Sequence, residues 1–256
     1  MIRETATAVS FFLTAYAILE VPIKAKGCLC MEDIKIHIIA RMRSDFPSKF
    51  GIPRQSGLIE TESKIIFEPQ YRDPDAIRGI EGFSHLWIIW EFSMSKTEKW
   101  KPTVRPPRLG GNKRVGVFAT RSPFRPNPIG LSCVKIKSVE KTTEYGPIIT
   151  VIGADMMNGT PIYDIKPYIP FSDAHPEALG GFAEEKFYKK LSVSFSEESL
   201  KELSPNDLTI LTKLLEQDPR PAYQHDPTRE YSFEYGNLSI KFNVKDNNLT
   251  VKSIIK

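Results

Sequence analysis

Short strand-like runs, separated by loops that contain proline or glycine, fill the first two thirds of this chain and set the strongest limit on its fold. The runs are rich in β-branched and aromatic residues, and little helical spacing occurs before about residue 180. Many short strands with few helices between them predict a barrel or a sandwich, and they argue against an alternating βαβ array. The expected strands are 35–40, 64–68, 83–92, 114–120, 130–140 and 147–154.

The run 83–92, FSHLWIIWEF, is almost continuously apolar. Its length and aromatic residues favour a strand buried on both faces, with a buried helix as the alternative. Neither a G-x-G-x-x-G nor a G-x-x-x-x-G-K-[ST] pattern occurs in the chain, so neither a Rossmann dinucleotide site nor a P-loop is supported.

The pattern changes after about residue 171 and predicts a smaller α+β domain over 172–256. A helix is expected over 182–190, and a second begins after Ser204, an N-cap residue followed by Pro205. The apolar face of this second helix is expected to be Leu208, Leu211, Leu214 and Leu215. Strands are expected at 231–235, 238–245 and 249–255, with Asn247-Asn248 as the turn between the last two.

Residues 1–30 are expected to be an N-terminal extension outside the fold, or the product of a start site placed too early, ahead of a β domain over 31–171. The apolar stretch 8–19 is too short to span a bilayer and lacks a clean small-x-small cleavage site. A peripheral membrane or targeting helix is the alternative. We expect no membrane-spanning segment.

The three cysteines, Cys28, Cys30 and Cys133, cannot form a disulfide framework, which favours a reducing cytoplasm. Cys28 and Cys30 have no matching Cys or His pair at zinc spacing, so no metal site is expected.

Segment 99–137 holds ten Lys and Arg residues and no Asp or Glu. The whole chain carries +4, so the remainder carries −6. Prolines and glycines interleave with these charges, which distinguishes the segment from an ordinary solvated charge run. A rigid cationic surface of this kind suits a polyanion or an anionic ligand group.

Four clusters mix polar side chains with proline or glycine, or lie beside an aromatic run: 52–55, 84–87, 120–131 and 155–168. His85 is embedded in an apolar strand, where a hydrogen-bonded core histidine is the more frequent role. Because no G-x-S-x-G accompanies it and no second histidine lies at metal spacing, hydrolase and metalloenzyme functions are not favoured. Lone carboxylates such as Asp155 and Asp164 are candidates for acid–base groups, but they are more often turn caps.

Several segments, taken in order, closely resemble the tRNA methyltransferase O family. They are Pro53-Arg54-Gln55, RPPRLGGNKRVGVFATRSPFRPNPIGLS at 105–132, NGTPIYDIKPY at 158–168 and DPRPAY at 218–223. The resemblance runs from about residue 33 to residue 255. It implies a mainly β protein, in which a small antiparallel β-barrel binds S-adenosylmethionine and a smaller α+β C-terminal domain follows.

The resemblance also implies a cytoplasmic homodimer that methylates N6 of N6-threonylcarbamoyladenosine beside the anticodon, with the tRNA anticodon stem-loop as partner. The implied cofactor contacts are Pro53, Arg54, Gln55, His85, Leu86, Arg121, Leu131, Asp155, Met156, Met157 and Asn158. Many relatives carry Asp where this chain has Asn158, so Asp155 would have to supply any acidic group needed there.

The implied tRNA contacts are Arg105, Arg108, Lys113, Arg114, Arg125, Asn127 and Arg220, and no catalytic residue is assigned. Methyl transfer mainly requires that donor and acceptor be aligned, and a carbamoyl group on the acceptor nitrogen acidifies its N–H, so a strong base is less necessary. Two alternatives remain at this stage: a non-catalytic RNA-binding barrel, and a methyltransferase for a small molecule or a protein. Within the basic segment, 99–114 is expected to face nucleic acid and 115–131 the cofactor.

Overall fold

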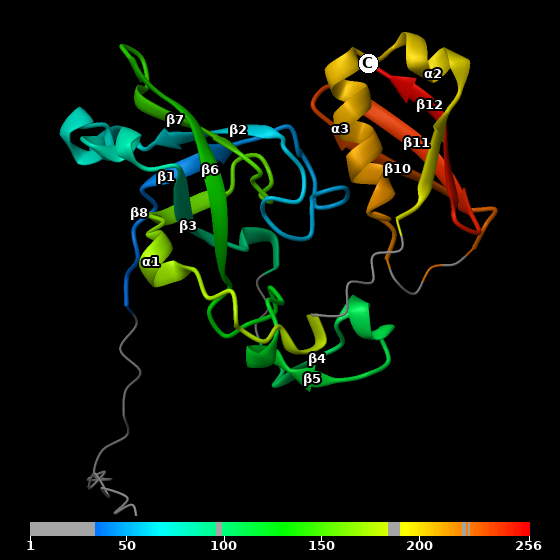
Figure 1. Ribbon diagram of the computed structural model, residues 1–256, viewed down its shortest axis with the longest axis horizontal. Helices are drawn as coiled ribbons and strands as arrows, with labels where there is room; N and C mark the ends of the chain where they lie inside the picture. Colours follow the sequence, from blue (N-terminus) through cyan, green and yellow to red (C-terminus); the bar gives the residue numbers. More distant parts are fainter. Residues whose placement is uncertain (1–33, 96–98, 184–189, 222–223, 225) are drawn as a thin grey trace, which may run out of the picture. The chain divides into compact units, whose positions relative to one another are not determined.

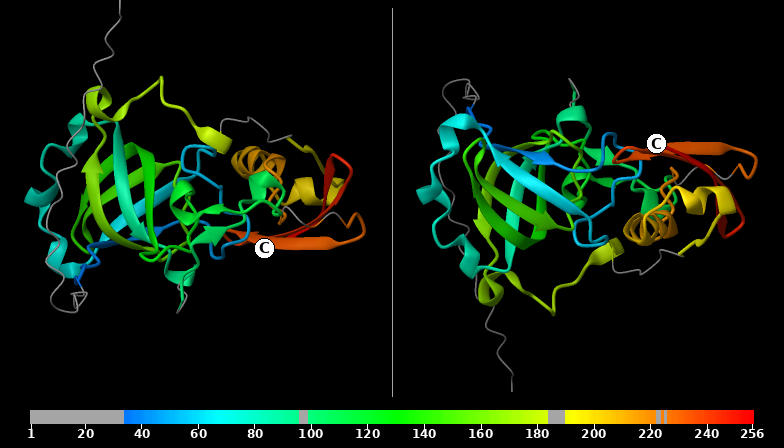
Figure 2. Two further views of the ribbon diagram at one scale, coloured as in Figure 1. Left: turned by 90° about the horizontal axis from the view of Figure 1, so that it is seen from below. Right: turned by 90° about the horizontal axis from the view of Figure 1, so that it is seen from above.

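The computed structural model describes residues 34–95, 99–183, 190–221, 224 and 226–256. Within this part, six antiparallel strands close into a barrel in the order β1-β2-β7-β6-β3-β8, labelled in Figure 1. Figure 2 shows the same strands from two further sides. The expected antiparallel barrel is confirmed. Its strands are β1 (Ala40–Arg43), β2 (Glu62–Phe67), β3 (His85–Glu91), β6 (Ile129–Thr142), β7 (Gly146–Ile152) and β8 (Pro161–Pro167).

Alternate side chains along β3 point into the barrel. Leu86 and Ile88 are fully buried and Trp90 is 7% exposed, whereas the residues between them are half-buried. This is the period-two pattern of a strand with one face toward the core, so the expectation that 83–92 is buried on both faces was wrong. Other strands and the β7–β8 connection complete the barrel core with Met42, Ile65, Val134, Ile149, Ile162 and Met156.

The outer face of β3 is partly covered by the chain that follows β8. The short helix α1 (Pro170–Asp173) places Asp173 beside Trp87, whose Nε1 donates a hydrogen bond to Asp173 Oδ2 at 2.9 Å. The Tyr168 ring lies 5.8 Å from the Trp87 ring, centroid to centroid. These contacts explain how an aromatic, apolar residue is accommodated on the outward face.

The loops of the barrel contain short 3-10 helices and one two-stranded ribbon. The ribbon pairs β4 (Thr103–Val104) with β5 (Val115–Gly116), so the strand expected at 114–120 is only two residues long before η6 (Val117–Ala119) begins. The other 3-10 helices are η1 (Pro69–Tyr71), η2 (Pro74–Ile77), η3 (Ile80–Gly82), η4 (Ser93–Ser95), η5 (Pro107–Leu109) and η7 (Gly181–Ala183).

The C-terminal part forms a separate four-stranded sheet in the order β10-β11-β12-β9. Strand β9 (Ser192–Phe195) pairs parallel to β12, and the other pairs are antiparallel. The expected α+β class is confirmed, although β9 was not expected from the sequence. The remaining strands are β10 (Glu230–Tyr235), β11 (Leu238–Lys245) and β12 (Asn248–Ile255).

Two helices accompany this sheet, α2 (Glu197–Lys201) and α3 (Pro205–Glu216). Ser204 caps α3 as expected, because its Oγ accepts a hydrogen bond from the Asp207 N–H at 3.1 Å. The buried face of α3 differs by one residue from the expectation, since Leu208 is half-buried and Ile210 is buried in its place. The buried residues are Ile210, Leu211, Leu214 and Leu215.

Two further expectations were wrong. Strand β1 starts at Ala40, not at residue 35, and the turn between β11 and β12 is Asp246-Asn247, with Asp246 at φ +55°. The helix expected at 182–190 lies mostly outside the described residues, as does the apolar stretch 8–19. Among the described residues, no helix has the length and apolar character needed to cross a membrane, and no group of three or more His, Cys, Asp or Glu side chains could hold a metal ion.

Candidate functional site

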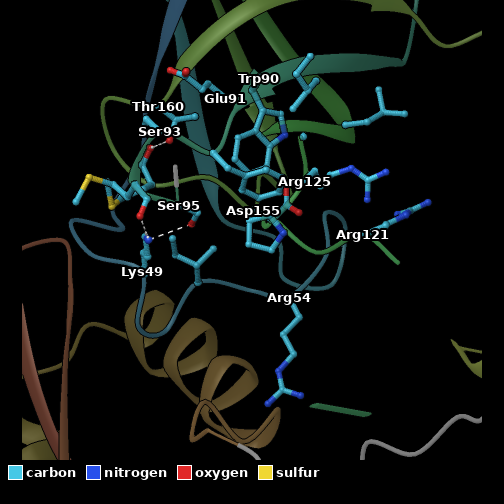
Figure 3. A pocket seen from close by; sticks show the side chains of 18 of the residues that line it. Lys49, Arg54, Trp90, Glu91, Ser93, Ser95, Arg121, Arg125, Asp155 and Thr160 are labelled. Carbon is cyan, nitrogen blue, oxygen red and sulfur yellow. Dashed lines mark hydrogen bonds between the residues drawn. The ribbon is translucent and has the colours of Figure 1, made fainter. Parts of the chain in front are cut away.

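A cavity of about 490 Å³ opens beside the C-terminal end of β3 and the start of β6 (Figure 3). Its volume lies in the range of about 300–1,000 Å³ that is usual for small-molecule and cofactor sites. Several expected cofactor contacts line it together, although they come from four separate stretches of sequence. They are Pro53, Arg54, Gln55, Arg121, Leu131, Asp155 and Met157.

The apolar walls of the cavity come mainly from three residues. Trp90 reaches it from the end of β3, Leu131 is 53% exposed although it lies in a barrel strand, and Pro53 is buried in the β1–β2 loop. A leucine side chain left exposed on a strand beside an indole offers a contact surface for a planar or apolar ligand group.

Arg121 and Gln55 join two motifs that lie far apart in the sequence. Arg121 Nη1 donates a hydrogen bond to Gln55 Oε1 at 2.6 Å, and Gln55 Nε2 donates to the Arg54 carbonyl at 2.6 Å. Arg54 in turn donates from Nη2 to the Asp218 carbonyl at 3.0 Å. Arg121 is exposed, so the rest of its guanidinium remains available for a carboxylate or phosphate.

Asp155 is a partly buried carboxyl at the wall of the cavity. Burial raises the pKa of Asp155 above its ordinary value, while the Ser132 hydrogen bond, backbone N–H groups and the Arg121 charge act in the opposite direction. Ser132 Oγ donates to Asp155 Oδ1 at 2.6 Å, and Trp90 Nε1 donates to Ser132 Oγ at 2.9 Å. In the view of Figure 3, Trp90 and Asp155 lie between Lys49 and Ser95 on one side and Arg121 and Arg125 on the other.

A second carboxylate, Glu91, lines the cavity from the last position of β3. The Tyr163 hydroxyl on β8 forms a hydrogen bond with it, and burial together with this carboxylate raises the pKa of Tyr163 to about 12. Near the same end, Lys49 Nζ donates to the Met94 carbonyl and, at 3.1 Å, to Ser95 Oγ.

Four expected cofactor contacts lie outside the cavity lining. His85 and Leu86 are at the opposite end of β3, where Leu86 is fully buried in the barrel core and His85 Nδ1 lies 2.9 Å from Ser84 Oγ. Met156 is fully buried in the same core. Asn158 is exposed, and its Oδ1 accepts a hydrogen bond from the Ser44 N–H at 3.3 Å.

A larger groove of about 1370 Å³ adjoins the cavity. Lys99, Lys101, Arg105 and Arg114 line it together with aromatic rings, of which Phe118 is 70% exposed. Cationic side chains with exposed aromatic rings are the usual components of a surface that binds single-stranded nucleic acid. The groove and the cavity share Arg54, Gln55, Thr120, Arg121 and Pro123.

Not all of the expected tRNA contacts face solvent. Arg105 and Arg114 line the groove, and Lys113 and Asn127 are exposed. The Arg125 guanidinium instead donates from Nη1 to the Thr120 carbonyl at 2.6 Å and to the Val117 carbonyl at 3.2 Å.

Arg220 is 9% exposed and binds both carboxylate oxygens of Asp218, at 2.7 and 2.8 Å. The positions of Arg125 and Arg220 therefore favour structural roles over phosphate binding. Arg108 lies in η5, and its side chain is outside the described part of the structure.

Trp90, Ser132 and Glu91 were missed in the sequence. Trp90 and Glu91 belong to a run that reads as barrel core, and Ser132 lies in an apolar strand. Their proximity depends on the register of β3 against β6, in which Trp90 faces Gly130 and Ile88 faces Ser132. An aromatic residue with a hydrogen-bond donor, paired with glycine across two strands, is the signal that could have indicated this arrangement.

The fold and the site define a two-domain β-barrel protein, in which a small-molecule cavity is continuous with a cationic, aromatic groove. Two family models match the chain: the tRNA-methyltransferase O N-terminal domain over residues 41–174 and the TrmO C-terminal domain over residues 188–256. The chain is 39% identical over 226 residues to the tRNA (adenine(37)-N6)-methyltransferase of Escherichia coli (strain K12), covering 84% of this chain and 95% of that protein.

It is also 36% identical over 212 residues to a Pseudomonas aeruginosa protein named as a candidate S-adenosylmethionine-dependent methyltransferase, RcsF, covering 79% of this chain and 89% of that one. The crystal structure of TrmO from Pseudomonas aeruginosa superposes with a TM-score of 0.70 at 27% identity, covering 88% of this chain and all of that one. The chain belongs to the tRNA-methyltransferase O family.

Proposed function

We propose that this protein transfers a methyl group from S-adenosylmethionine to N6 of adenosine 37 in tRNA. The observation that carries this proposal is the pair of adjoining sites, in which the cavity and the basic groove have Arg54, Gln55, Thr120, Arg121 and Pro123 in common. A tRNA methyltransferase must hold a small donor and a nucleotide next to each other, and much of its rate enhancement comes from that alignment.

The residues of the cavity fit S-adenosylmethionine. Trp90, Leu131 and Pro53 offer apolar surface for an adenine, and the exposed Arg121 guanidinium offers paired N–H donors for the methionine carboxylate. Asp155 and Glu91 supply carboxylates that suit a ligand carrying positive charge. When bound, S-adenosylmethionine supplies an electrophilic methyl group, while the protein orients the two reactants and shields them from water.

The groove fits the nucleic acid partner. Lys99, Lys101, Arg105 and Arg114 would neutralise phosphates, which makes the affinity fall with salt. Phe118 would stack on an unpaired base, as exposed aromatic rings do in proteins that bind single strands. An anticodon loop presents both kinds of group.

We further infer a cytoplasmic homodimer whose acceptor is N6-threonylcarbamoyladenosine. The support for this is the resemblance of segments 105–132, 158–168 and 218–223 to the family. The carbamoyl substituent would acidify the acceptor N–H, so a weak base is enough to take its proton. The carboxylates that line the cavity are bases of that kind. Light scattering during size-exclusion chromatography tests the dimer, and a monomeric mass would remove that part of the proposal.

Titration calorimetry with S-adenosylmethionine tests cofactor binding, and Arg121→Ala is the informative variant. Loss of its charge-assisted hydrogen bonds should weaken binding by roughly 10- to 100-fold. Arg78→Ala is the matched control, because Arg78 is exposed, forms an ion pair with Asp75 at 2.5 Å and lines neither the cavity nor the groove. Folded protein that binds no cofactor would instead support a non-catalytic RNA-binding barrel.

Mass spectrometry of nucleosides tests the acceptor. tRNA from a strain that lacks the methyltransferase is incubated with the protein and S-adenosylmethionine, then digested. A mass gain of one methyl group on threonylcarbamoyladenosine is expected. Methylation of unmodified adenosine instead would refute threonylcarbamoyladenosine as the acceptor, and the protein would still be a tRNA methyltransferase.

A further inference from the structure

A chain of hydrogen bonds with a fixed direction runs from the barrel core to the wall of the cavity. Ser132 is 1% exposed, accepts from Trp90 Nε1 at 2.9 Å and donates to Asp155 Oδ1 at 2.6 Å. An indole N–H can donate but not accept, so the serine must use its single proton on the aspartate. The hydroxyl is therefore locked as a donor to Asp155.

Gly130 makes this chain possible. It faces Trp90 across the β3–β6 pair, and a Cβ atom at residue 130 would lie 2.3 Å from the Trp90 Cε2 atom. Because only glycine leaves this space, the indole can lie over the backbone with its Nε1 directed at Ser132. The orientation of Trp90 is thus set by backbone register and not by loop conformation.

Asp155 is held in a state suited to accepting a proton. Burial raises the pKa of Asp155, which makes the carboxylate a better base, while donors from Ser132 and from the backbone of Asp155 and Ser56 keep the ionised form favourable. Arg121 adds a stabilising charge. The other charged groups that line the cavity are Lys49, Arg54, Glu91 and Arg125.

We propose that Asp155 accepts the proton of the acceptor nitrogen during methyl transfer, and that Ser132 and Trp90 are positioning residues that aim its carboxylate. This inference rests on the proposed function. As the N–CH₃ bond forms, the bond between that methyl carbon and sulfur breaks and its electron pair stays on the sulfur. The N–H proton passes to the Asp155 carboxylate, which later releases it to water. No other co-reactant is needed.

Single-turnover methylation of tRNA at saturating S-adenosylmethionine, from about pH 5 to about pH 9, tests the role of Asp155. Asp155→Asn should lower the rate by about 100-fold or more, the usual contribution of a general base, and should remove the acidic limb of the pH profile. The half-buried Asp164 on β8, which forms an ion pair with Lys166 at 2.8 Å, gives the matched control Asp164→Asn, with an unchanged rate and profile.

Ser132→Ala tests the positioning role. Loss of a hydrogen bond to the charged form raises the pKa of Asp155 further, so the acidic limb should move to higher pH and the rate at low pH should fall by roughly 10- to 100-fold. Ser132→Thr keeps the hydroxyl and should restore the wild-type profile. Ser138→Ala, on the same strand with its hydroxyl 3.3 Å from Glu140, is the matched control and should leave the profile unchanged.

Two measurements separate this role from cofactor binding and from a folding defect. Calorimetry with S-adenosylhomocysteine should give similar dissociation constants for the wild type, Asp155→Asn and Ser132→Ala. A ¹³C carboxyl titration of the protein without ligand should show a higher pKa for Asp155 in Ser132→Ala.

A large loss of S-adenosylhomocysteine binding in Asp155→Asn with an unchanged saturated rate would overturn the inference and leave Asp155 as a cofactor contact alone. An acidic limb that does not move in Ser132→Ala would overturn the positioning role. A wild type that binds S-adenosylhomocysteine but methylates no tRNA would remove the proposed function and this role with it.

Discussion

Replacing Gly130 by alanine is the sharpest test of how the cavity wall is built. The new methyl group would lie 2.3, 2.6 and 2.7 Å from three atoms of the Trp90 indole. These distances are far inside van der Waals contact, and Trp90 is 7% exposed in a packed barrel. The indole must therefore tilt, and its hydrogen bond to Ser132 lengthens or breaks.

The size of the effect follows from three contributions. Overpacking a core costs about 1–3 kcal/mol, and the lost hydrogen bond about 1 kcal/mol. Alanine restricts the unfolded chain more than glycine does, which returns about 0.4–1 kcal/mol. The net expectation is a loss of about 1–3.5 kcal/mol in the free energy of unfolding, or a melting temperature lower by roughly 2–14 °C.

Urea and thermal unfolding, followed by near-ultraviolet circular dichroism, measure this loss. Gly116→Ala on β5 is the control, because no atom lies within 4 Å of its added Cβ, and it should change stability by less than about 0.5 kcal/mol. Trp90→Leu combined with Gly130→Ala should recover part of the loss, because the smaller side chain makes room for the methyl group. If Gly130→Ala proves as stable as the wild type, with an unchanged tryptophan spectrum, the packing described for Trp90 and Gly130 is refuted.

Three further expectations concern the groove, the barrel and the N-terminus. Lys113→Ala with Arg114→Ala should weaken tRNA binding and reduce the slope of log affinity against log salt by roughly 1–2, as filter binding at several salt concentrations would reveal; a loss of cofactor binding alone would contradict this. The pKa of Tyr163, raised from 10.0 to about 12, means that its contribution to stability is complete below pH 10.0 and is lost as the pH rises through about 12. Tyr163→Phe should therefore remove part of the alkaline fall in the free energy of unfolding, and an identical fall in both proteins would disprove the assignment. Deleting residues 1–30 should leave folding and methylation intact, measured by circular dichroism and nucleoside mass spectrometry, and a deletion variant that fails to fold would place these residues within the domain.

The strands were predictable because β-branched and aromatic runs between proline and glycine have few other folds open to them. The partial exposure of the outward face of β3 could not be predicted in this way. Its outward face looked buried because Trp87 and Ile89 are apolar, and the contact that accommodates Trp87 comes from Asp173, which is 86 residues away. Local sequence carries no information about such a partner. Likewise, β9 joins its sheet by parallel pairing with β12. This contact is long-range, and a strand of only four residues is too short to be predicted from its own sequence.

The residues of the candidate site likewise fall into those that the sequence indicated and those whose role only the structure reveals. Arg54, Gln55 and Arg121 lie in clusters that mix polar residues with proline and in segments that resemble the family, and the structure brings them together. The sequence could not distinguish an arginine that faces solvent from one that is bound internally, so Arg125 and Arg220 looked like Arg105. Each of those two guanidiniums is instead held by backbone carbonyls or a neighbouring carboxylate.

The five residues shared by the cavity and the groove have a thermodynamic consequence. Gln55 and Arg121 are hydrogen bonded to each other, so a ligand that moves one of them changes the surface offered to the second ligand. Linkage requires such coupling to be reciprocal: whatever factor the cofactor applies to the affinity for tRNA, tRNA applies to the affinity for the cofactor. If S-adenosylmethionine occupies the cavity as proposed, methyl transfer also turns a cationic sulfonium into a neutral thioether beside these residues. The coupling can thus differ before and after the reaction, so the two substrates and the two products can bind with different cooperativity.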